Sequence, residues 1–300
     1  MAISFNADLI DDLARRRVVL FLGAGVSASA VTNSGGRFKG WGAFLEAAAA
    51  LLSDVDDKRA LKRILRDKDY LLASEMLRRI LGPKWTEFVE EEFGQAATPS
   101  RLHTALIKLD QRLILTTNFD RLLETAWSRA NDGVSTKTHH PIVISEIDAN
   151  ALRLFRDPRD FIVKLHGTID KPDGMVFDKS SYHRFAYANS FYDELLKSLL
   201  LTHTFLFVGF SMDDPAVSMI VERAAHRFPQ ARPHYILAPS KLHPAEDALW
   251  RKLRGLYVLS YRKNNHHREL VKGLTDLVPA VEMRRQELVA EERLAVEQKP

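Results

Sequence analysis

The chain carries six short runs of apolar and β-branched residues, separated by stretches with helical spacing. The runs are RVVLFLG (17–23), RLILTTN (112–118), FIVKLHG (161–167), TFLFVGF (204–210), PHYIL (233–237) and LYVLSY (256–261). Uniformly apolar runs of this length are typical of strands that are buried on both faces of a parallel sheet. Helices are expected at 5–16, 120–130, 189–201, 215–227, 243–253 and 266–278. This alternation predicts an α/β fold with a doubly wound parallel sheet.

A long helical stretch separates the first predicted strand from the second. Residues from about 42 to 94 are rich in good helix formers, and Gly82-Pro83 marks a stop within them. We therefore expect a helical insertion over about 42–110 in a domain that spans 1–279. The last segment, 280–300, is charged and prone to form a helix. It is expected to be a C-terminal helical tail, either a solvated end or an arm that docks a partner chain.

Composition narrows the class of protein. The 300 residues are 46% hydrophobic and 27% charged, as in ordinary globular proteins, and the net charge of +4 is too small to predict direct nucleic-acid binding. The absence of cysteine excludes disulfides, thiolate zinc sites and a cysteine nucleophile. The stretch RRRVVLFLGAGVSASA has features of a secretion signal, but acidic residues precede it and two glycines interrupt it. No apolar run approaches the roughly 20 residues of a membrane helix, so we expect a cytoplasmic protein without membrane contact.

Polar residues gather where four of the predicted strands end. The clusters are Gly23-Ala24-Gly25-Val26-Ser27, Thr116-Thr117-Asn118-Phe119-Asp120, His166-Gly167, and Gly209-Phe210-Ser211 followed by Asp213-Asp214-Pro215. In doubly wound sheets the ligand binds outside the carboxyl ends of the strands. The four clusters are therefore expected to line one crevice and to face a ligand.

Each cluster also has a purely structural interpretation. Asp120 and Asp214 suit helix N-caps, with Pro215 at the first helical position. Asn118 suits a turn, and an isolated histidine such as His166 is more often a core residue with satisfied hydrogen bonds. The coincidence of four clusters at one edge of the sheet favours a binding site over these separate explanations.

The glycine turn favours a phosphate ligand, because a helix N-terminus after such a turn attracts anions. The sequence GAGVSA also fits the G-x-G-x-x-G/A fingerprint of dinucleotide sites. Dehydrogenases place an acidic residue at the end of a second strand about 20 residues later. Here that stretch is an alanine-rich helix with Glu46 inside it. We therefore expect a nucleotide but not hydride transfer.

The motifs GAGVS, TTNFD, KLHG and GFSMDDP, in this order across about residues 17–262, resemble the sirtuin family and, within it, a bacterial zinc-free branch that acts in anti-phage defence. The resemblance implies a Rossmann-like core with NAD+ as substrate. It assigns the pyrophosphate and a ribose to Gly23, Ala24, Gly25 and Ser27, and the adenosine side to Gly209, Phe210 and Ser211. It places Asn118 and Asp120 beside the nicotinamide ribose, with Thr117 as a further residue that binds NAD+. Catalysis is assigned to His166 with Asn118 and Asp120.

Two departures from the family pattern bear on the reaction. Sirtuin deacylases follow the glycine turn with Pro-Asp-Phe-Arg, where this chain has VTNSGGRFKGW, and they carry a four-cysteine zinc ribbon that this chain lacks. Both departures argue against deacylation and leave the chemistry of NAD+ intact. Asn118 is expected to fix a ribose hydroxyl or the attacking water, and His166 to act as general base. Asp120 is expected to orient the nicotinamide amide or to support Asn118.

The main prediction is therefore an NAD+ glycohydrolase that forms nicotinamide and ADP-ribose and depletes NAD+ in anti-phage defence. A protein deacylase and a non-catalytic sensor of NAD+ or ADP-ribose are the alternatives. The resemblance also implies a homo-oligomer, in some relatives with a HerA-type hexameric ATPase, and substitution of Leu288 and Leu294 by Asp is expected to disrupt assembly. The histidine pairs His139-His140 and His266-His267 lack a carboxylate at ligand spacing, so no metal is expected.

Overall fold

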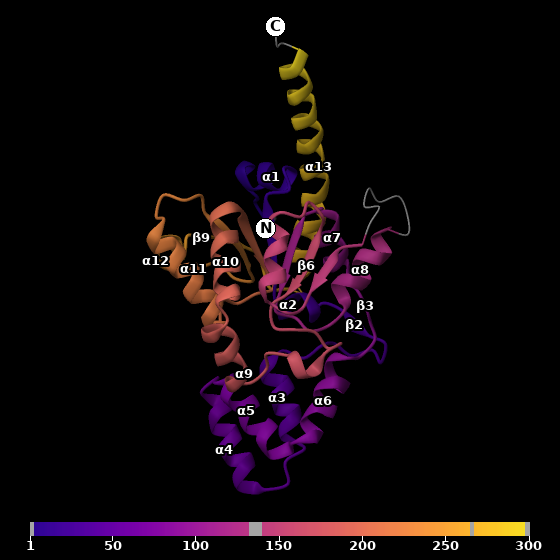
Figure 1. Cartoon of the computed structure of the whole chain (residues 1–300), viewed down its shortest axis with the longest axis vertical. Helices are drawn as coiled ribbons and strands as arrows, with labels where there is room; N and C mark the ends of the chain where they lie inside the picture. The colour runs from indigo at the N-terminus through magenta and orange to yellow at the C-terminus, as the bar shows by residue number, and fades with distance from the viewer. Residues whose placement is uncertain (1–2, 132–139, 265–266, 298–300) are drawn as a thin grey trace.

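The computed structural model describes residues 3–131, 140–264 and 267–297, and its centre is a parallel sheet of seven strands in the order β5-β6-β4-β1-β7-β8-β9 (Figure 1). From β1 the chain adds β4 and β6 on one side and β7, β8 and β9 on the other. The order therefore reverses at β1, and the predicted doubly wound sheet is confirmed. The strands are β1 (Val18–Leu22), β4 (Leu113–Thr116), β5 (Ile142–Ile144), β6 (Phe161–Lys164), β7 (Thr204–Val208), β8 (His234–Ala238) and β9 (Leu256–Ser260). The sequence did not predict β5, which has only three residues.

Two hydrophobic cores cover the two faces of the sheet, which explains why the strands are uniformly apolar. Leu20 of β1 belongs to one core and its neighbour Phe21 to the other, and both side chains are fully buried. The first core contains the helices α1 (Ala7–Ala14), α7 (Arg101–Lys108), α8 (Leu122–Asn131) and α13 (Arg268–Glu297). The second contains the 3₁₀ helix η1 (Ala149–Phe155), α10 (Ser190–Thr202), α11 (Pro215–Arg227) and α12 (Pro244–Arg254).

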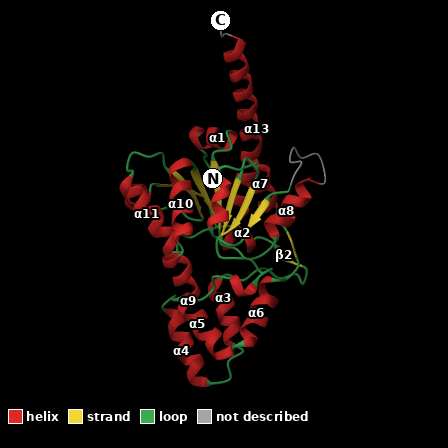
Figure 2. Ribbon diagram, viewed as in Figure 1, coloured by secondary structure: helices red, strands yellow, loops and turns green. Residues whose placement is uncertain are grey.

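A helical module lies at the end of the sheet to which the strand arrows point (Figure 2). It has a core of its own, in which Phe44 and Trp85 pack with Phe177 at ring-centroid distances of 5.2 and 5.6 Å. The module comprises α3 (Trp41–Ala49), α4 (Val55–Arg66), α5 (Tyr70–Leu81) and α6 (Pro83–Phe93), and the short strands β2 (Val31–Thr32) and β3 (Ala97–Thr98) pair where the chain enters and leaves it. The predicted insertion ran to residue 110, but α7 packs in the core of the sheet.

The C-terminal helix α13 is continuous from Arg268 to Glu297 and passes through Pro279. The boundary expected at residue 280 therefore falls inside this helix. Leu288 is buried in the core of the sheet, and Arg285 donates a hydrogen bond of 2.8 Å from Nη2 to the carbonyl oxygen of Leu109. Beyond these contacts the helix extends away from the body of the protein (Figure 1). None of the described helices has the length and apolarity required to cross a membrane.

Candidate functional site

A cavity of about 630 Å³ lies between the carboxyl ends of the strands and the helical module. It contains residues from all four polar strand ends. The expected site residues that line it are Ala24, Gly25, Ser27, Thr117, Asn118, Asp120, His166, Gly209, Phe210 and Ser211, and Gly23 is buried behind its wall. Its size lies within the range of small-molecule and cofactor sites. The structure thus brings the residues from the four motifs together.

The glycine turns after β1 and β7 pack backbone against backbone. The N–H of Gly25 donates a hydrogen bond of 2.9 Å to the carbonyl oxygen of Gly209. A Cβ atom at Gly209 would lie 2.6 Å from the backbone nitrogen of Val26, so only glycine fits there. The helix that follows, α2 (Ala24–Ser27), is a single turn of four residues. The helix that the glycine turn opens, whose N-terminus was expected to attract phosphate, therefore has only one turn.

Ser27, Asn118 and Asp120 form a hydrogen-bonded group at the floor of the cavity. The Nδ2 atom of Asn118 donates to the carbonyl oxygen of Gly23 at 2.9 Å and to Oγ of Ser27 at 2.8 Å. Oγ of Ser27 in turn donates to Oδ2 of Asp120 at 2.5 Å. Both donor hydrogens of the Asn118 amide are therefore engaged, and its oxygen is left as the acceptor.

Asp120 also serves as the helix cap that the sequence suggested. Its Oδ1 atom accepts a hydrogen bond of 2.9 Å from the N–H of Leu122 at the start of α8, while Oδ2 binds Ser27. The side chain is buried. Because both carboxylate oxygens have partners in the protein, the geometry favours support of Asn118 through Ser27 over direct contact with nicotinamide.

Two buried residues beside Asp120 were not identified from the sequence. Lys164, on β6, is fully buried, and its Nζ atom donates to the carbonyl oxygen of Asp120 at 2.5 Å and forms an ion pair of 2.8 Å with Glu124. The other is His103, on α7, whose Nδ1 atom accepts from the backbone N–H of Ser100 at 3.2 Å. Burial lowers the pKa of His103 to about 4, although the charge of Asp120 acts in the opposite direction. The only sequence signals were a lysine in an apolar strand and a serine three residues before a histidine.

His166 lies in the wall of the cavity next to aromatic rings. Its ring centroid is 5.4 Å from that of Phe185, with the two planes perpendicular, and the side chain is 9% exposed. Its Nε2 atom is buried and makes no hydrogen bond within the described residues, but lies 3.3 Å from Oδ2 of Asp214. His166 is therefore not a core histidine with satisfied hydrogen bonds, which was the structural alternative.

Asp214 caps α11, as expected, and it also contacts the site. Its Oδ1 atom accepts hydrogen bonds from the N–H of Val217 at 3.0 Å and from the hydroxyl of Tyr182 at 2.7 Å. Burial alone would raise the pKa of Asp214, but contact with His166 and these hydrogen bonds hold that pKa below its ordinary value. Asp214 is therefore a buried carboxylate beside the histidine.

The helical module supplies the opposite wall of the cavity, which sequence reasoning did not predict. Its contributions include Phe38 and Lys39 before α3, Trp41 and Phe44 on it, and Lys68, Asp69, Tyr70 and Leu71 around the start of α5. Lys39 forms an ion pair with Glu92 at 2.5 Å. Phe38 and Trp41 belong to the VTNSGGRFKGW segment that was compared with the Pro-Asp-Phe-Arg loop of deacylases. The positions around the start of α5 gave no signal because their role depends on how the module docks on the sheet.

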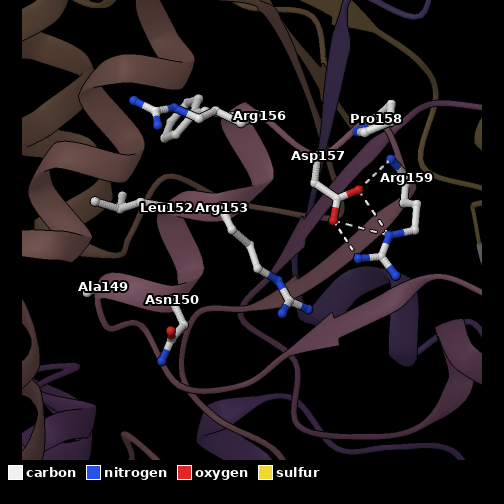
Figure 3. Close-up of a pocket in the computed structure, with 9 residues that line it drawn as sticks. Ala149, Asn150, Leu152, Arg153, Arg156, Asp157, Pro158 and Arg159 are labelled. Atoms are coloured by element: carbon white, nitrogen blue, oxygen red, sulfur yellow. Dashed lines mark hydrogen bonds and ion pairs between the residues drawn. The ribbon is translucent and has the colours of Figure 1, made fainter.

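A larger pocket, of about 980 Å³, lies elsewhere (Figure 3). One segment of the chain lines it, with the residues Ala149, Asn150, Leu152, Arg153, Phe155, Arg156, Asp157, Pro158 and Arg159. Its three arginines do not converge: the guanidinium groups of Arg153 and Arg156 point in different directions, and Arg159 is bound to Asp157 at 2.6 Å (Figure 3). All three arginines are exposed. The cavity at the strand ends, where polar groups from several elements meet, is therefore the candidate site.

No group of three or more His, Asp or Glu side chains that could hold a metal ion occurs among the residues that the structure describes. Of the histidine pairs noted in the sequence, His139 and His266 lie outside these residues. His140 is exposed, and Nδ1 of His267 lies 2.9 Å from the hydroxyl oxygen of Tyr261.

Comparison with known proteins agrees with the motifs in the cavity. Residues 112–259 match the family model of the SIR2-like domain. The chain is 30% identical to NAD(+) hydrolase ThsA of Cytobacillus dafuensis over 206 residues, and 25% identical to NAD(+) hydrolase ThsA of Bacillus cereus (strain MSX-D12) over 236 residues. It is 21% identical to Defense-associated sirtuin 2 of Bacillus subtilis over 199 residues.

These alignments cover 68%, 78% and 64% of this chain, but only 37%, 45% and 19% of the relatives, in the same order. The chain therefore spans less than half the length of the curated relatives it matches. The match to the family model includes Asn118, Asp120, His166 and the turn at Gly209. The resemblance seen in the four motifs is confirmed, and the chain belongs to the sirtuin-like, or SIR2-like, family.

Proposed function

We propose that this chain hydrolyses the bond between nicotinamide and ribose in NAD+ and releases nicotinamide and ADP-ribose. The observation that carries the proposal is that one cavity brings together the side chain of His166 and an Asn118 amide whose donor hydrogens are both engaged, which leaves its oxygen as the acceptor. Four of the relatives that this chain matches are named NAD(+) hydrolases, which supports this reaction over others.

The bond to nicotinamide is activated, because the ring is a cation that leaves as a neutral pyridine. When the bond breaks, its electron pair passes to the ring nitrogen and the ribose becomes an oxocarbenium-like centre. Water then forms the new bond to that carbon. The oxygen of Asn118 accepts a hydrogen bond from this water or from a ribose hydroxyl, and His166 takes up the proton that the water loses. Asp120 orients the hydroxyl of Ser27 by a hydrogen bond, and this hydroxyl in turn orients the Asn118 amide.

The biological role we propose is depletion of NAD+ in anti-phage defence, which draws on the names of the relatives. An enzyme of this kind needs restraint until it is triggered. We propose that a homo-oligomer, with a HerA-type ATPase or another defence protein as partner, provides that restraint in the cytoplasm. The end of α13 that extends beyond the body of the protein is the local feature in favour of such contacts.

The products distinguish this proposal from its alternatives. The purified chain would be incubated with NAD+ in water enriched in oxygen-18, with and without an acetyl-lysine peptide, and the products separated by chromatography and weighed by mass spectrometry. The proposal predicts nicotinamide and ADP-ribose that carries one heavy oxygen, with no need for peptide. Acyl-ADP-ribose formed only with peptide would indicate a deacylase. Binding of NAD+ without any product, even with the proposed partner added, would indicate a sensor.

A further inference from the structure

Asp214 uses its two carboxylate oxygens for different purposes. Oδ1 accepts the hydrogen bonds from Val217 N–H and the Tyr182 hydroxyl, and this alone completes the cap of α11. Oδ2 is not needed for the cap and lies 3.3 Å from Nε2 of His166. An ordinary N-cap differs: at Asp54, which caps α4 on the surface, a single oxygen, Oδ1, accepts from the N–H groups of Asp56 and Asp57.

The carboxylate is fixed from behind. The hydroxyl of Tyr182 donates to Oδ1 of Asp214 at 2.7 Å and accepts from the N–H of Ala216 at 2.7 Å. The Tyr182 ring also lies against His166, with the centroids 6.1 Å apart. Burial and then the charge of Asp214 raise the pKa of Tyr182, so this hydroxyl remains a donor at neutral pH.

The surroundings make the contact between Asp214 and His166 strong. The two side chains are 10% and 9% exposed, and the perpendicular ring of Phe185 covers another side of the histidine. With little water present, a carboxylate stabilises a protonated imidazole more than it would at a surface. Asp214 and Tyr182 are the titratable groups that contact the ring, and Tyr192 lies behind them with a fully buried hydroxyl. The distance of 3.3 Å is long for a hydrogen bond, as is common in ligand-free catalytic sites.

We infer that Asp214 is the positioning residue for His166, held in turn by Tyr182. The carboxylate fixes the Nε2 side of the ring with its hydrogen toward Oδ2, so Nδ1 is the nitrogen that takes the proton from water. The ring then carries two N–H groups, and the adjacent carboxylate stabilises this charge until the proton leaves to solvent. This inference deepens the proposed hydrolysis of NAD+ and rests on it for the catalytic step.

The first test compares Asp214→Asn with the matched variant Asp54→Asn. An asparagine oxygen still caps a helix, so both variants are expected to keep the melting temperature of the unchanged chain within about 2 °C. We expect Asp214→Asn to lower kcat for nicotinamide release on the order of 10- to 100-fold with KM nearly unchanged, and Asp54→Asn to leave both constants unaltered. A kcat of Asp214→Asn within twofold of the unchanged chain would overturn the inference.

A second measurement does not depend on activity. The two ring nitrogens of His166 would be followed by nitrogen-15 NMR with the ring neutral, and the assignment made from loss of the signals in His166→Ala. In the unchanged chain the ring hydrogen should lie on Nε2, toward Asp214. In Asp214→Asn the oxygen of the asparagine still caps α11, so its NH2 group faces Nε2 and the ring hydrogen should move to Nδ1, whereas in Asp54→Asn it should stay on Nε2. An unchanged tautomer in Asp214→Asn overturns the inference. Absence of nicotinamide release from the unchanged chain would instead count against the proposed function, and the NMR result would then decide the inference alone.

Discussion

Ser27 joins two strand ends that are far apart in the sequence. It lies in the turn after β1, accepts a hydrogen bond from Asn118 and donates one to Asp120, both in the turn after β4. The hydroxyl is buried, so the two bonds are made in a region of low dielectric constant. We conclude that Ser27, together with the carbonyl oxygen of Gly23, sets the orientation of the Asn118 amide on which the proposed chemistry depends.

Replacement of Ser27 by Ala should therefore impair the reaction without unfolding the protein. Loss of the hydroxyl leaves the Asn118 amide held by its hydrogen bond to Gly23 without the bond to Ser27. It removes hydrogen bonds worth about 1 kcal/mol each, so kcat should fall on the order of tenfold. Ser128→Ala, which removes an exposed serine hydroxyl of α8, is the matched control and should have no effect. Steady-state nicotinamide release measures both, and equal kcat values for the two variants would contradict the role given to Ser27.

For single residues, the sequence predicted which ones lie at the cavity better than it predicted which side chains contact one another. Asn118 and His166 were placed at the cavity because polar residues after apolar strands lie at one edge of a parallel sheet. The contact of Asp214 with His166 depends on where the start of α11 lies relative to the turn after β6, and the burial of Lys164 depends on the turn after β4 that folds over it. Neither the spacing of residues nor their type carries that information.

Among the elements, the two glycine turns that meet at the switch point of the sheet matter most for the site. The turn after β7 has Gly209 at φ +62°, in contact with the backbone of the turn after β1. Gly255, which ends α12, has nearly the same φ of +61°, but its nearest neighbour would be a side-chain Cβ atom at 3.5 Å. A comparison of substitutions at Gly209 and Gly255 therefore separates two energetic terms: the strain of a left-handed backbone, and the clash between an added Cβ atom and neighbouring backbone.

We expect Gly255→Ala to lower the free energy of unfolding by about 1 kcal/mol, the cost of a left-handed alanine. Gly209→Ala should cost roughly 3 kcal/mol or more, because a Cβ atom 2.6 Å from the nitrogen of Val26 forces the turns apart. Urea unfolding followed by circular dichroism measures both values. Equal losses of stability would show that the close approach of the two turns is not important.

Three elements differ from what the sequence predicted, each for a physical reason of its own. The strand β5 has only three residues, too few for a clear pattern. Helix α7 was included in the insertion because its helical spacing does not reveal which core it packs in. A proline usually marks the end of a helix, but at Pro279 the contacts of α13 with α1 and α7 outweigh this preference.

For the molecule as a whole, α13 contributes to the fold and also extends from it. Leu288 is 7% exposed in the core, whereas Leu294 is 56% exposed near the end of the helix. Of the two leucines whose substitution was expected to disrupt assembly, therefore, only Leu294 is exposed enough to contact another chain.

Leu288→Asp should lower the melting temperature of the protein by several degrees or more, because it places a charge in the core. Leu294→Asp should leave the melting temperature unchanged and, if the proposed homo-oligomer uses this end of α13, reduce the molar mass measured by light scattering. A stable Leu294→Asp variant with the full mass of the unchanged chain would count against assembly through α13.

The stability of the whole chain should also depend on pH through His103. Its pKa of about 4 in the folded protein lies below the ordinary value of 6.5, so as pH falls the unfolded chain takes up the proton first. The free energy of unfolding should therefore decrease from about pH 6.5 to about pH 4, with His103 contributing on the order of 3 kcal/mol and His234, whose pKa burial also lowers to about 4, adding to the decrease. His103→Gln should flatten this decrease, as measured by urea unfolding at several pH values, while the exposed His226→Gln should not. A profile for His103→Gln as steep as that of the unchanged chain would contradict the assignment.

The most direct test of the central claim is the release of nicotinamide from NAD+ by the purified chain, compared with His166→Ala, Asn118→Ala and His226→Ala. The account predicts release of nicotinamide and ADP-ribose in equal amounts by the unchanged chain and by His226→Ala, and a fall on the order of 100-fold or more in the other two variants. Equal release by all four proteins would show that the reaction takes place outside this cavity. A failure of the unchanged chain even to bind NAD+ would contradict the assignment of the cavity itself.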